Sequence, residues 1–381
     1  MGILAAVAGT FLIMPSTQRR STDYLGASPS IAYSTNSTVH AQPTPNWKLN
    51  SQILASRSSL KKIQMLDATK GWMAAYPMGV YRTSDAAETW QQVSLKLPER
   101  AYVTDIFFVS PDAGWVAASK TGLDFEESKD TGSYDDATWI METSDAGKSW
   151  RKNLTLEKAQ ITQIRFVGNS EGWAAGRRFS NGGSARDTNL VLHTNDGGRN
   201  WIDVSGNLPP SDTGVDQLFG IDQGRISLLT LNGFIYSTID GGQNWHQVDA
   251  FRDQREQTAI HRAGVTQNES LWLLGGTSSQ EGTSSIFAIK EGGGNWARRE
   301  IAAIDLADAL FLSEDRIIAC GSMSSGKERE AVILYSIDRG ANWVIAHRNR
   351  ESTALNSLAT IDSKRLLSAG EGGLVLHIEL P

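Results

Sequence analysis

The chain has 381 residues, of which 40% are hydrophobic, and it contains 36 glycines. This composition is typical of a globular protein with many turns. The formal net charge of −6 is small for this length, so it provides no bulk attraction to nucleic acid. Cys320 is the only cysteine, which excludes an intramolecular disulfide and a cysteine-based zinc site. It lies in the strand-like run RIIACG, where we expect a buried thiol.

Residues 1–45 form a segment of their own. Positions 3–14 (ILAAVAGTFLIM) are apolar, but this run is shorter than the roughly 20 residues that span a bilayer. It resembles the hydrophobic region of a secretory signal, although no positive charge precedes it and Arg19–Arg20 follow it. A Ser/Thr/Pro-rich stretch continues to residue 45. We therefore expect a signal-like or disordered segment over 1–45 and an exported protein, with a disordered tail on a cytoplasmic protein as the alternative.

One turn sequence recurs six times at intervals of about fifty residues, which indicates a series of similar supersecondary units. The copies are TSDAAETW (83–90), TSDAGKSW (143–150), TNDGGRNW (194–201), TIDGGQNW (238–245), IKEGGGNW (289–296) and SIDRGANW (336–343). The carboxylate is placed to accept N–H groups of its own turn, glycine supplies a positive φ, and tryptophan covers the turn. The residues that we expect in these structural roles are Asp85, Trp90, Asp145, Trp150, Asp196, Trp201, Asp240, Trp245, Glu291, Trp296, Asp338 and Trp343.

Two copies depart from the pattern. The first has Ala87 where the others have glycine, and the fifth has Ile289 and Glu291 in place of the hydroxyl residue and the aspartate. We expect both turns to persist with weaker internal bonding, because packing between the units holds them.

The residues around the turns complete a unit of four strands. Gly-Trp pairs stand at 71–72, 114–115 and 172–173. Nine residues before each glycine lies a polar residue, Lys62, Asp105 or Gln163, followed by alternating apolar residues. This pattern predicts two strands joined by a short turn, a variable loop, a third strand, the Asp turn and a fourth strand. Four antiparallel strands in about 48 residues form one blade of a β-propeller.

The two ends of the chain supply the last blade. Strands are predicted at 355–360, 365–369 and 373–379, after which no further Trp turn follows. The missing outer strand is found at 46–49, where Asn-Trp matches the start of the fourth strands. The sequence thus predicts an all-β, seven-bladed propeller over 46–381, whose ring is closed by pairing of the N-terminal strand with the C-terminal blade.

The turn motif S/T-x-D-x-G-x-x-W resembles the BNR or Asp-box repeat of sialidases and sortilin-type receptors. The fuller unit, with its Gly-Trp pair and T-x-D-G-G-x-x-W turn, most resembles the photosystem II stability/assembly factor family, over nearly everything from residue 46 onward. This resemblance implies a non-catalytic scaffold that binds subunits of a membrane complex, without metal, cofactor or nucleic acid. We further expect a monomer with peripheral membrane contact, in the periplasm or the thylakoid lumen.

The loops between second and third strands, and those linking blades, share the rim opposite the Asp turns, and their lengths vary most. Loops on a rigid scaffold commonly carry function. Arg177, Arg178 and Arg186 lie in such a loop of blade three and suit carboxylates of a protein partner, so we predict that they bind one. The alternative is a surface that only keeps the protein soluble. The acidic residues of 120–137 match no defined calcium loop, and a solvated loop is the simpler interpretation.

The alternative function is a carbohydrate-binding or glycoside-hydrolysing, sialidase-like propeller. The Phe/Tyr-Arg-Ile-Pro string of sialidases is missing before Asp85. Asp105 and Asp308 occupy comparable positions on first strands, where two facing carboxylates would suit a glycosidase. The equivalent residues of other blades are Lys62, Gln163 and Ser357, a mixture that a water-filled channel also needs. We therefore predict that the chain is not an enzyme.

Overall fold

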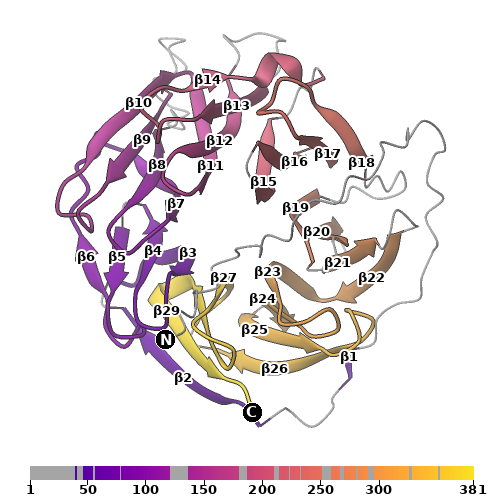
Figure 1. The fold of residues 1–381 in the computed structure, drawn as a ribbon. Helices are drawn as coiled ribbons and strands as arrows, with labels where there is room; N and C mark the ends of the chain where they lie inside the picture. The colour runs from indigo at the N-terminus through magenta and orange to yellow at the C-terminus, as the bar shows by residue number, and fades with distance from the viewer. Residues whose placement is uncertain are drawn as a thin grey trace, which may run out of the picture.

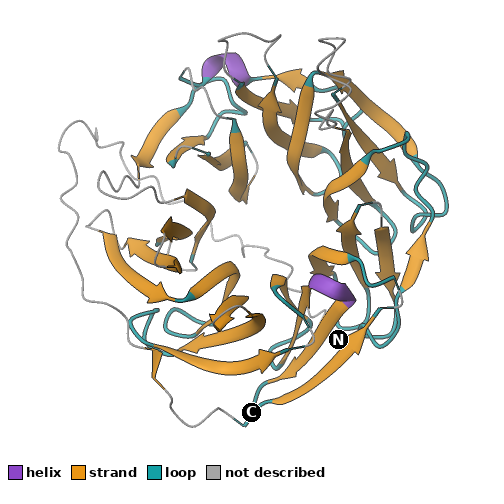
Figure 2. Cartoon of the chain, turned by 180° about the vertical axis from the view of Figure 1, so that it is seen from behind, coloured by secondary structure: helices purple, strands orange, loops and turns teal. Residues whose placement is uncertain are grey.

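The structure is a computed structural model. It describes residues 39–381 except 41–45, 55, 78, 121–135, 180–186, 210–213, 223, 232, 251–258, 267–269, 280–281, 291–295, 326–327 and 351. Within these residues, strands form seven sheets arranged around a central axis, which confirms the predicted seven-bladed propeller (Figure 1). Two short 3-10 turns, η1 (Ser205–Asn207) and η2 (Glu371–Gly373), accompany the strands (Figure 2).

Each blade is a four-stranded antiparallel unit whose first strand lies nearest the axis (Figure 1). Blade one contains β3 (Ser59–Met65), β4 (Gly71–Tyr76), β5 (Gly79–Thr83) and β6 (Gln91–Val93). Blade two contains β7 (Tyr102–Phe108), β8 (Gly114–Lys120), β9 (Ala137–Thr143) and β10 (Arg151–Glu157). Blade three contains β11 (Ala159–Val167), β12 (Glu171–Arg178), β13 (Thr188–Thr194) and β14 (Ile202–Asp203). Blade four contains β15 (Val215–Asp222), β16 (Arg225–Thr230), β17 (Phe234–Thr238) and β18 (His246–Ala250). Blade five contains β19 (Ala259–Val265), β20 (Leu271–Ser279), β21 (Gly282–Lys290) and β22 (Trp296–Ala302). Blade six contains β23 (Ile304–Phe311), β24 (Ile317–Ser325), β25 (Glu328–Ser336) and β26 (Trp343–Asn349).

Blade seven is shared between the two ends of the chain, as predicted. Its strands are β27 (Leu355–Thr360), β28 (Arg365–Gly370), β29 (Leu374–Glu379) and β2 (Lys48–Ile53). β2 pairs antiparallel with β29 from Lys48↔Glu379 to Ile53↔Leu374, so the ring is closed by backbone pairing. The short strand β1 (Val39–His40), inside the segment expected to be linker, pairs in parallel with the edge of β26.

The Asp turns are closed by a repeated set of hydrogen bonds. In the fourth turn, Thr238 Oγ1 donates to Asp240 Oδ1 (2.7 Å) and accepts the Gly242 amide (3.0 Å). The two oxygens of Asp240 also accept the Asn244 amide (2.9 Å) and side-chain Nδ2 (2.7 Å). Equivalent bonds surround Asp85, Asp145, Asp196 and Asp338. The structural role predicted for these aspartates fits this network.

The first turn corrects one expectation. Ala87 adopts a left-handed φ of 69°, and its amide still donates to Thr83 Oγ1 (3.1 Å). Its internal bonding is therefore as complete as in the glycine-containing turns, and the predicted weakening is wrong there. Glu291 of the fifth turn lies outside the described residues, while Trp296 begins β22 and is buried.

The Gly-Trp pairs join neighbouring blades through aromatic stacking. Phe108 lies directly opposite Gly114 in the β7–β8 pairing, where a Cβ at Gly114 would lie 2.2 Å from the Phe108 ring. Trp72 of blade one stacks on Phe108 of blade two with ring centroids 3.9 Å apart. Trp115 likewise stacks on Phe166 of blade three at 3.4 Å. Glycine therefore makes room for the aromatic ring that receives the tryptophan of the preceding blade.

The core lies between the blades rather than in one central cluster. Its apolar groups combine side chains of adjacent sheets, for example Trp72 with Ile106 and Phe108. Cys320 is fully buried there, as predicted, and burial raises the pKa of its thiol.

Candidate functional site

The seven innermost strands share one irregularity that shapes the channel wall. Each carries a β-bulge near its start, which turns one extra residue out of the regular pairing. The extra residues are Lys61, Thr104, Thr162, Asp216, His261, Ala307 and Asn356. They are followed by Lys62, Asp105, Gln163, Gln217, Arg262, Asp308 and Ser357. Because the bulge lies at the start of each strand, the extra residues gather at the rim opposite the Asp turns, here called the mouth rim.

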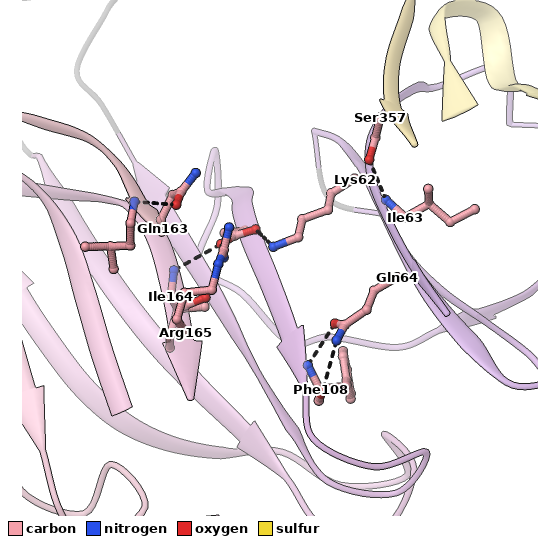
Figure 3. Close-up of polar contacts among 10 residues, drawn as sticks. Lys62, Ile63, Gln64, Phe108, Gln163, Ile164, Arg165 and Ser357 are labelled. Carbon is pink, nitrogen blue, oxygen red and sulfur yellow. Dashed lines mark hydrogen bonds and ion pairs between the residues drawn. The ribbon is translucent and has the colours of Figure 1, made fainter. Parts of the chain in front are cut away.

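The residues that follow the bulges tie the blades together. Their acceptor atoms bind backbone amides of the next blade: Asp105 with Ile164 (3.0 Å), Gln163 with Leu218 (2.9 Å), Gln217 with Ala263 (2.6 Å), Asp308 with Leu358 (3.0 Å) and Ser357 with Ile63 (3.3 Å). Figure 3 shows some of these ties, together with Gln64, which exchanges two bonds with the Phe108 backbone. The interpretation of this position as lining for a water-filled channel is therefore wrong, because most of these side chains are buried between blades.

Asp105 is the centre of a buried charge cluster. Its Oδ1 accepts a bond from Lys62 Nζ (2.5 Å), and its Oδ2 accepts one from Arg165 Nη1 (2.6 Å) (Figure 3). Burial alone would raise the pKa of Asp105, but the charges of Lys62 and Arg165 bring it below the usual value. Burial lowers the pKa of Lys62 to about 8, and repulsion from Arg165 adds to this effect. With three blades supplying one member each, the cluster is a structural clamp rather than a pair of facing catalytic carboxylates.

A cavity of about 670 Å³ opens at the mouth of the channel. Five of the extra bulge residues line it: Lys61, Asp216, His261, Ala307 and Asn356. The segment before β27 and the start of β25 complete its wall with Thr353 and Arg329. This is the size range of ligand-binding clefts, and its lining is predominantly polar and charged.

Two ion pairs lie at the mouth. Lys61 Nζ binds Glu371 Oε1 (3.0 Å), and the same oxygen accepts bonds from Ser59 (2.7 Å) and Asn356 (2.9 Å). Burial raises the pKa of Glu371, but these hydrogen bonds outweigh it and lower the pKa below its usual value. Glu371 thus fastens blade seven to blade one beside the closing strand.

The second ion pair lies on blade six. Arg329 Nη2 binds Asp305 Oδ2 (2.9 Å) and Ser322 Oγ (2.5 Å). Both Asp305 and Arg329 are about half exposed, so this pair stays accessible to a ligand in the cavity. Arg329 is the second residue of β25, and the structure brings it to the mouth.

Asp216 differs from the other carboxylates of the mouth. Burial raises its pKa to about 6, and the charge of Arg262 only partly offsets this effect. Arg262 Nε lies 3.7 Å from Asp308 Oδ1 of the neighbouring blade, so its guanidinium is shared with another carboxylate. In the described part of the chain, no hydrogen bond or ion pair joins Asp216.

Two of the arginines predicted to bind a partner, Arg177 and Arg178, lie at the mouth rim of blade three. Arg177 contacts Gln160 (3.0 Å) and packs on Phe179 and beside Gly214, two residues before Asp216. Arg178 pairs with Asp203 (2.5 Å). Both side chains are more than one third exposed. Arg186 lies outside the described residues, as do residues 121–135 of the acidic loop.

Sequence reasoning missed Lys61, Asp216, Arg262 and Glu371. In blades one to three the spacing to the Gly-Trp pair located the residue after the bulge, but it gave no sign of the bulge itself. Blade four lacks a Gly-Trp pair, so Asp216 had no marker of this kind. The signal that could have identified Asp216 is a charged residue directly before the polar residue that ties one blade to the next, here Gln217.

The described residues contain no cluster of three or more His, Cys, Asp or Glu side chains suited to a metal ion. They also contain no helix with the length and apolar character needed to cross a membrane. Among the carboxylates that line the mouth, Asp305 and Glu371 are both held by ion pairs. The described lining residues include no tyrosine, so the arrangement differs from the arginine-triad site expected for a sialidase.

Comparison with known sequences supports the resemblance inferred from the repeats. Residues 123–251, which span parts of blades two to four, match the family described as Photosynthesis system II assembly factor YCF48. The Photosystem II assembly lipoprotein Ycf48 of Synechococcus sp. (strain CC9902) is 25% identical over 214 residues, which cover 55% of this chain and 51% of that protein. The chain thus spans about half the length of this curated relative. It is an Asp-box propeller that resembles photosystem II assembly factors.

Solved structures agree with the fold. One described as YCF48 bound to D1 peptide has a TM-score of 0.63 and 16% identity, covering 90% of this chain and 100% of that one. A GH74 enzyme from Niastella koreensis has a TM-score of 0.55 and 14% identity, covering 84% of this chain and 52% of that one. At these identities, both likenesses concern the propeller architecture.

Proposed function

We propose that this chain is a non-catalytic scaffold that binds a segment of a membrane-complex subunit, such as one of photosystem II, during assembly or maintenance of the complex. The observation that carries the proposal is the cavity at the channel mouth, whose charged lining is mostly organised in ion pairs. Such a lining offers donors and acceptors to a polypeptide on a rigid support.

The comparisons support a peptide as the occupant. The similar sequences are described as photosystem II assembly factors, and one similar structure is described with a D1 peptide. An extended segment entering the cavity would find the carboxylates, the Asn356 amide and Arg329 within the same space. Arg177, Arg178 and Arg186 would enlarge the contact along the mouth rim. In this proposal the chain works without a metal or cofactor.

The proposal also places the chain outside the cytoplasm. Residues 1–45 would act in export, and the propeller of residues 46–381 would work in the periplasm or thylakoid lumen beside the membrane. The curated relative described as a lipoprotein supports a position at a membrane surface.

The test is site-specific crosslinking from the two rims. A photoreactive amino acid replaces Thr353, an exposed residue at the mouth, and in a matched protein it replaces Ser144, an exposed residue of the second Asp turn. We expect a membrane-complex subunit to crosslink from 353 but not from 144. The substitution Ala307→Trp, which fills the mouth, should abolish the crosslink, whereas Lys148→Trp on the opposite rim should preserve it. Equal crosslinking from both rims, or none, would refute the scaffold proposal.

A glycosidase is the second candidate, favoured by the GH74 likeness and by the raised pKa of Asp216, a property of general acids. A retaining or inverting mechanism needs a second carboxylate free to act. Asp305 and Glu371 are instead engaged with cations. Release of reducing sugar from a panel of glycans, lost in Asp216→Asn, would replace the scaffold proposal with an enzymatic one.

A further inference from the structure

We propose that the channel mouth receives a cationic group of its partner, a lysine or arginine side chain or a free amino terminus, against the carboxylate of Asp216. The inference rests on the proposed scaffold function and specifies the chemistry of the segment that enters the cavity.

One carboxylate of the mouth lacks the close partner that the other two have. Lys61 is matched by Glu371, and Arg329 is matched by Asp305. Arg262 has Asp308 beside it, at 3.7 Å. The cavity lining thus holds three cations and three carboxylates, and the cation whose charge acts on Asp216, Arg262, is shared with Asp308. Asp216 is the lining carboxylate that no hydrogen bond or ion pair joins within the residues that the structure describes.

The fold itself does not need a carboxylate at this position. Asp216 is the extra residue of its bulge, and the equivalent positions of other blades hold threonine in two cases, alanine at 307 and asparagine at 356. The neighbouring Gln217 provides the tie to blade five, with bonds to the Ala263 amide and carbonyl. Asp216 is therefore free to serve a ligand, and its largely buried position strengthens its attraction for a cation that displaces water.

An anionic occupant fits the same cavity less well. The lysine and the arginine that reach the open part of the mouth are each neutralised by a carboxylate within 3.0 Å. A carboxylate or phosphate would have to compete with these partners and would meet the negative charge of Asp216. A basic group at Asp216 would meet the charge of Arg262, but Asp308 shares that guanidinium, so the geometry points to a cation.

The first experiment uses a defined probe with the full chain. The probe is an acetylated, amidated pentapeptide whose only amine is a central lysine, and its twin carries acetyl-lysine. A zero-length carbodiimide joins carboxylates to amines in contact, and mass spectrometry measures the adduct at Asp216 and at Asp112, an exposed carboxylate of the opposite rim. We expect the adduct at Asp216 to exceed that at Asp112 at least about tenfold. The inference would be overturned if the adducts at Asp216 and Asp112 were equally abundant. It would also be overturned if NMR showed that the acetyl-lysine peptide binds as tightly as the lysine peptide.

The second experiment uses the partner crosslinked from residue 353. Asp216→Asn should weaken its binding at least about tenfold, and Asp216→Lys should weaken it further, while Asp112→Asn should leave it unchanged. Thermal unfolding confirms that each variant is folded. A partner that binds wild type and Asp216→Asn equally refutes the cation and leaves the scaffold function standing. Failure to recover any partner from the mouth refutes the scaffold function, and the inference falls with it.

Discussion

The buried cluster around Asp105 predicts a sharp asymmetry between its acidic and basic members. Asp105→Asn removes the carboxylate that neutralises Lys62 and Arg165 at this site, and both cations remain between the blades. Breaking a buried ion pair by removing one partner destabilises a protein by about 3–5 kcal/mol, because the remaining charge stays out of water. We expect Asp105→Asn to lower the free energy of unfolding by about that amount.

Lys62→Met should behave differently. Asp105 then keeps Arg165 at 2.6 Å and the Ile164 amide at 3.0 Å. The pKa of Lys62 is already lowered from 10.5 to about 8, because burial and Arg165 disfavour the ammonium. This shift corresponds to a penalty of about 3 kcal/mol for the charged form at neutral pH. Replacing the lysine with an apolar side chain of similar length should therefore cost less than about 1 kcal/mol or stabilise the protein.

The pH dependence provides an independent check. A lysine whose pKa is lower in the folded state makes stability rise with pH between about 8 and 10.5, because the unfolded chain holds the proton longer. Urea unfolding followed by tryptophan fluorescence at pH 7, 8, 9 and 10 measures this rise. Wild type should show it and Lys62→Met should not. If Lys62→Met proves as destabilising as Asp105→Asn, or keeps the rise, the assignment of Asp105 as the essential member is wrong.

Two further predictions concern the repeats. Gly114→Ala should destabilise the fold by about 1–3 kcal/mol, because its Cβ would lie 2.2 Å from the Phe108 ring, whereas Gly206→Ala, which has open space, should be nearly neutral in the same urea titration. The pKa values of three Asp-turn carboxylates are lowered to about 2, since hydrogen bonds within their turns favour the ionised form: Asp145, Asp196 and Asp240. Their contribution should be complete above about pH 4 and lost as pH falls toward 2, so the triple asparagine variant should lose less thermal stability over that range than wild type does.

The architecture could be predicted from the sequence because the blades repeat the same short sequence signals. An Asp turn is specified by residues within eight positions of each other, and a Gly-Trp pair marks the second strand in three of the blades. The same local signals, matched between residues 46–49 and the other fourth strands, predicted the closing pair of β2 and β29. Seven blades follow from counting such units, without any knowledge of how they contact each other.

The mouth could not be predicted in the same way, because its contacts join residues far apart in sequence. Glu371 meets Lys61 across 310 positions, and Arg262 approaches Asp308 across a blade boundary. A polar residue on a first strand looks the same in sequence whether it faces water or ties an amide of the next blade, as Gln163 does. Loop length and composition in the sequence indicated that the mouth rim carries function. The ion pairs of the mouth could not be predicted in this way, because their residues meet only when the ring is closed.

Asp216 connects stability to function in a measurable way. Its pKa is raised from 3.8 to about 6, so the ionised form is disfavoured in the folded protein by up to about 3 kcal/mol above pH 6, and this penalty disappears below about pH 4. Asp216→Asn should therefore stabilise the chain at pH 8 and leave it nearly unchanged at pH 4, as urea unfolding at the two pH values would show. A loss of stability at pH 8 would mean that Asp216 supports the fold through a contact. A gain of stability at pH 8, together with weaker partner binding, would show that the chain keeps a destabilising charge at this position for recognition. Other blades have threonine, alanine or asparagine in the same place, so the fold itself does not require that charge.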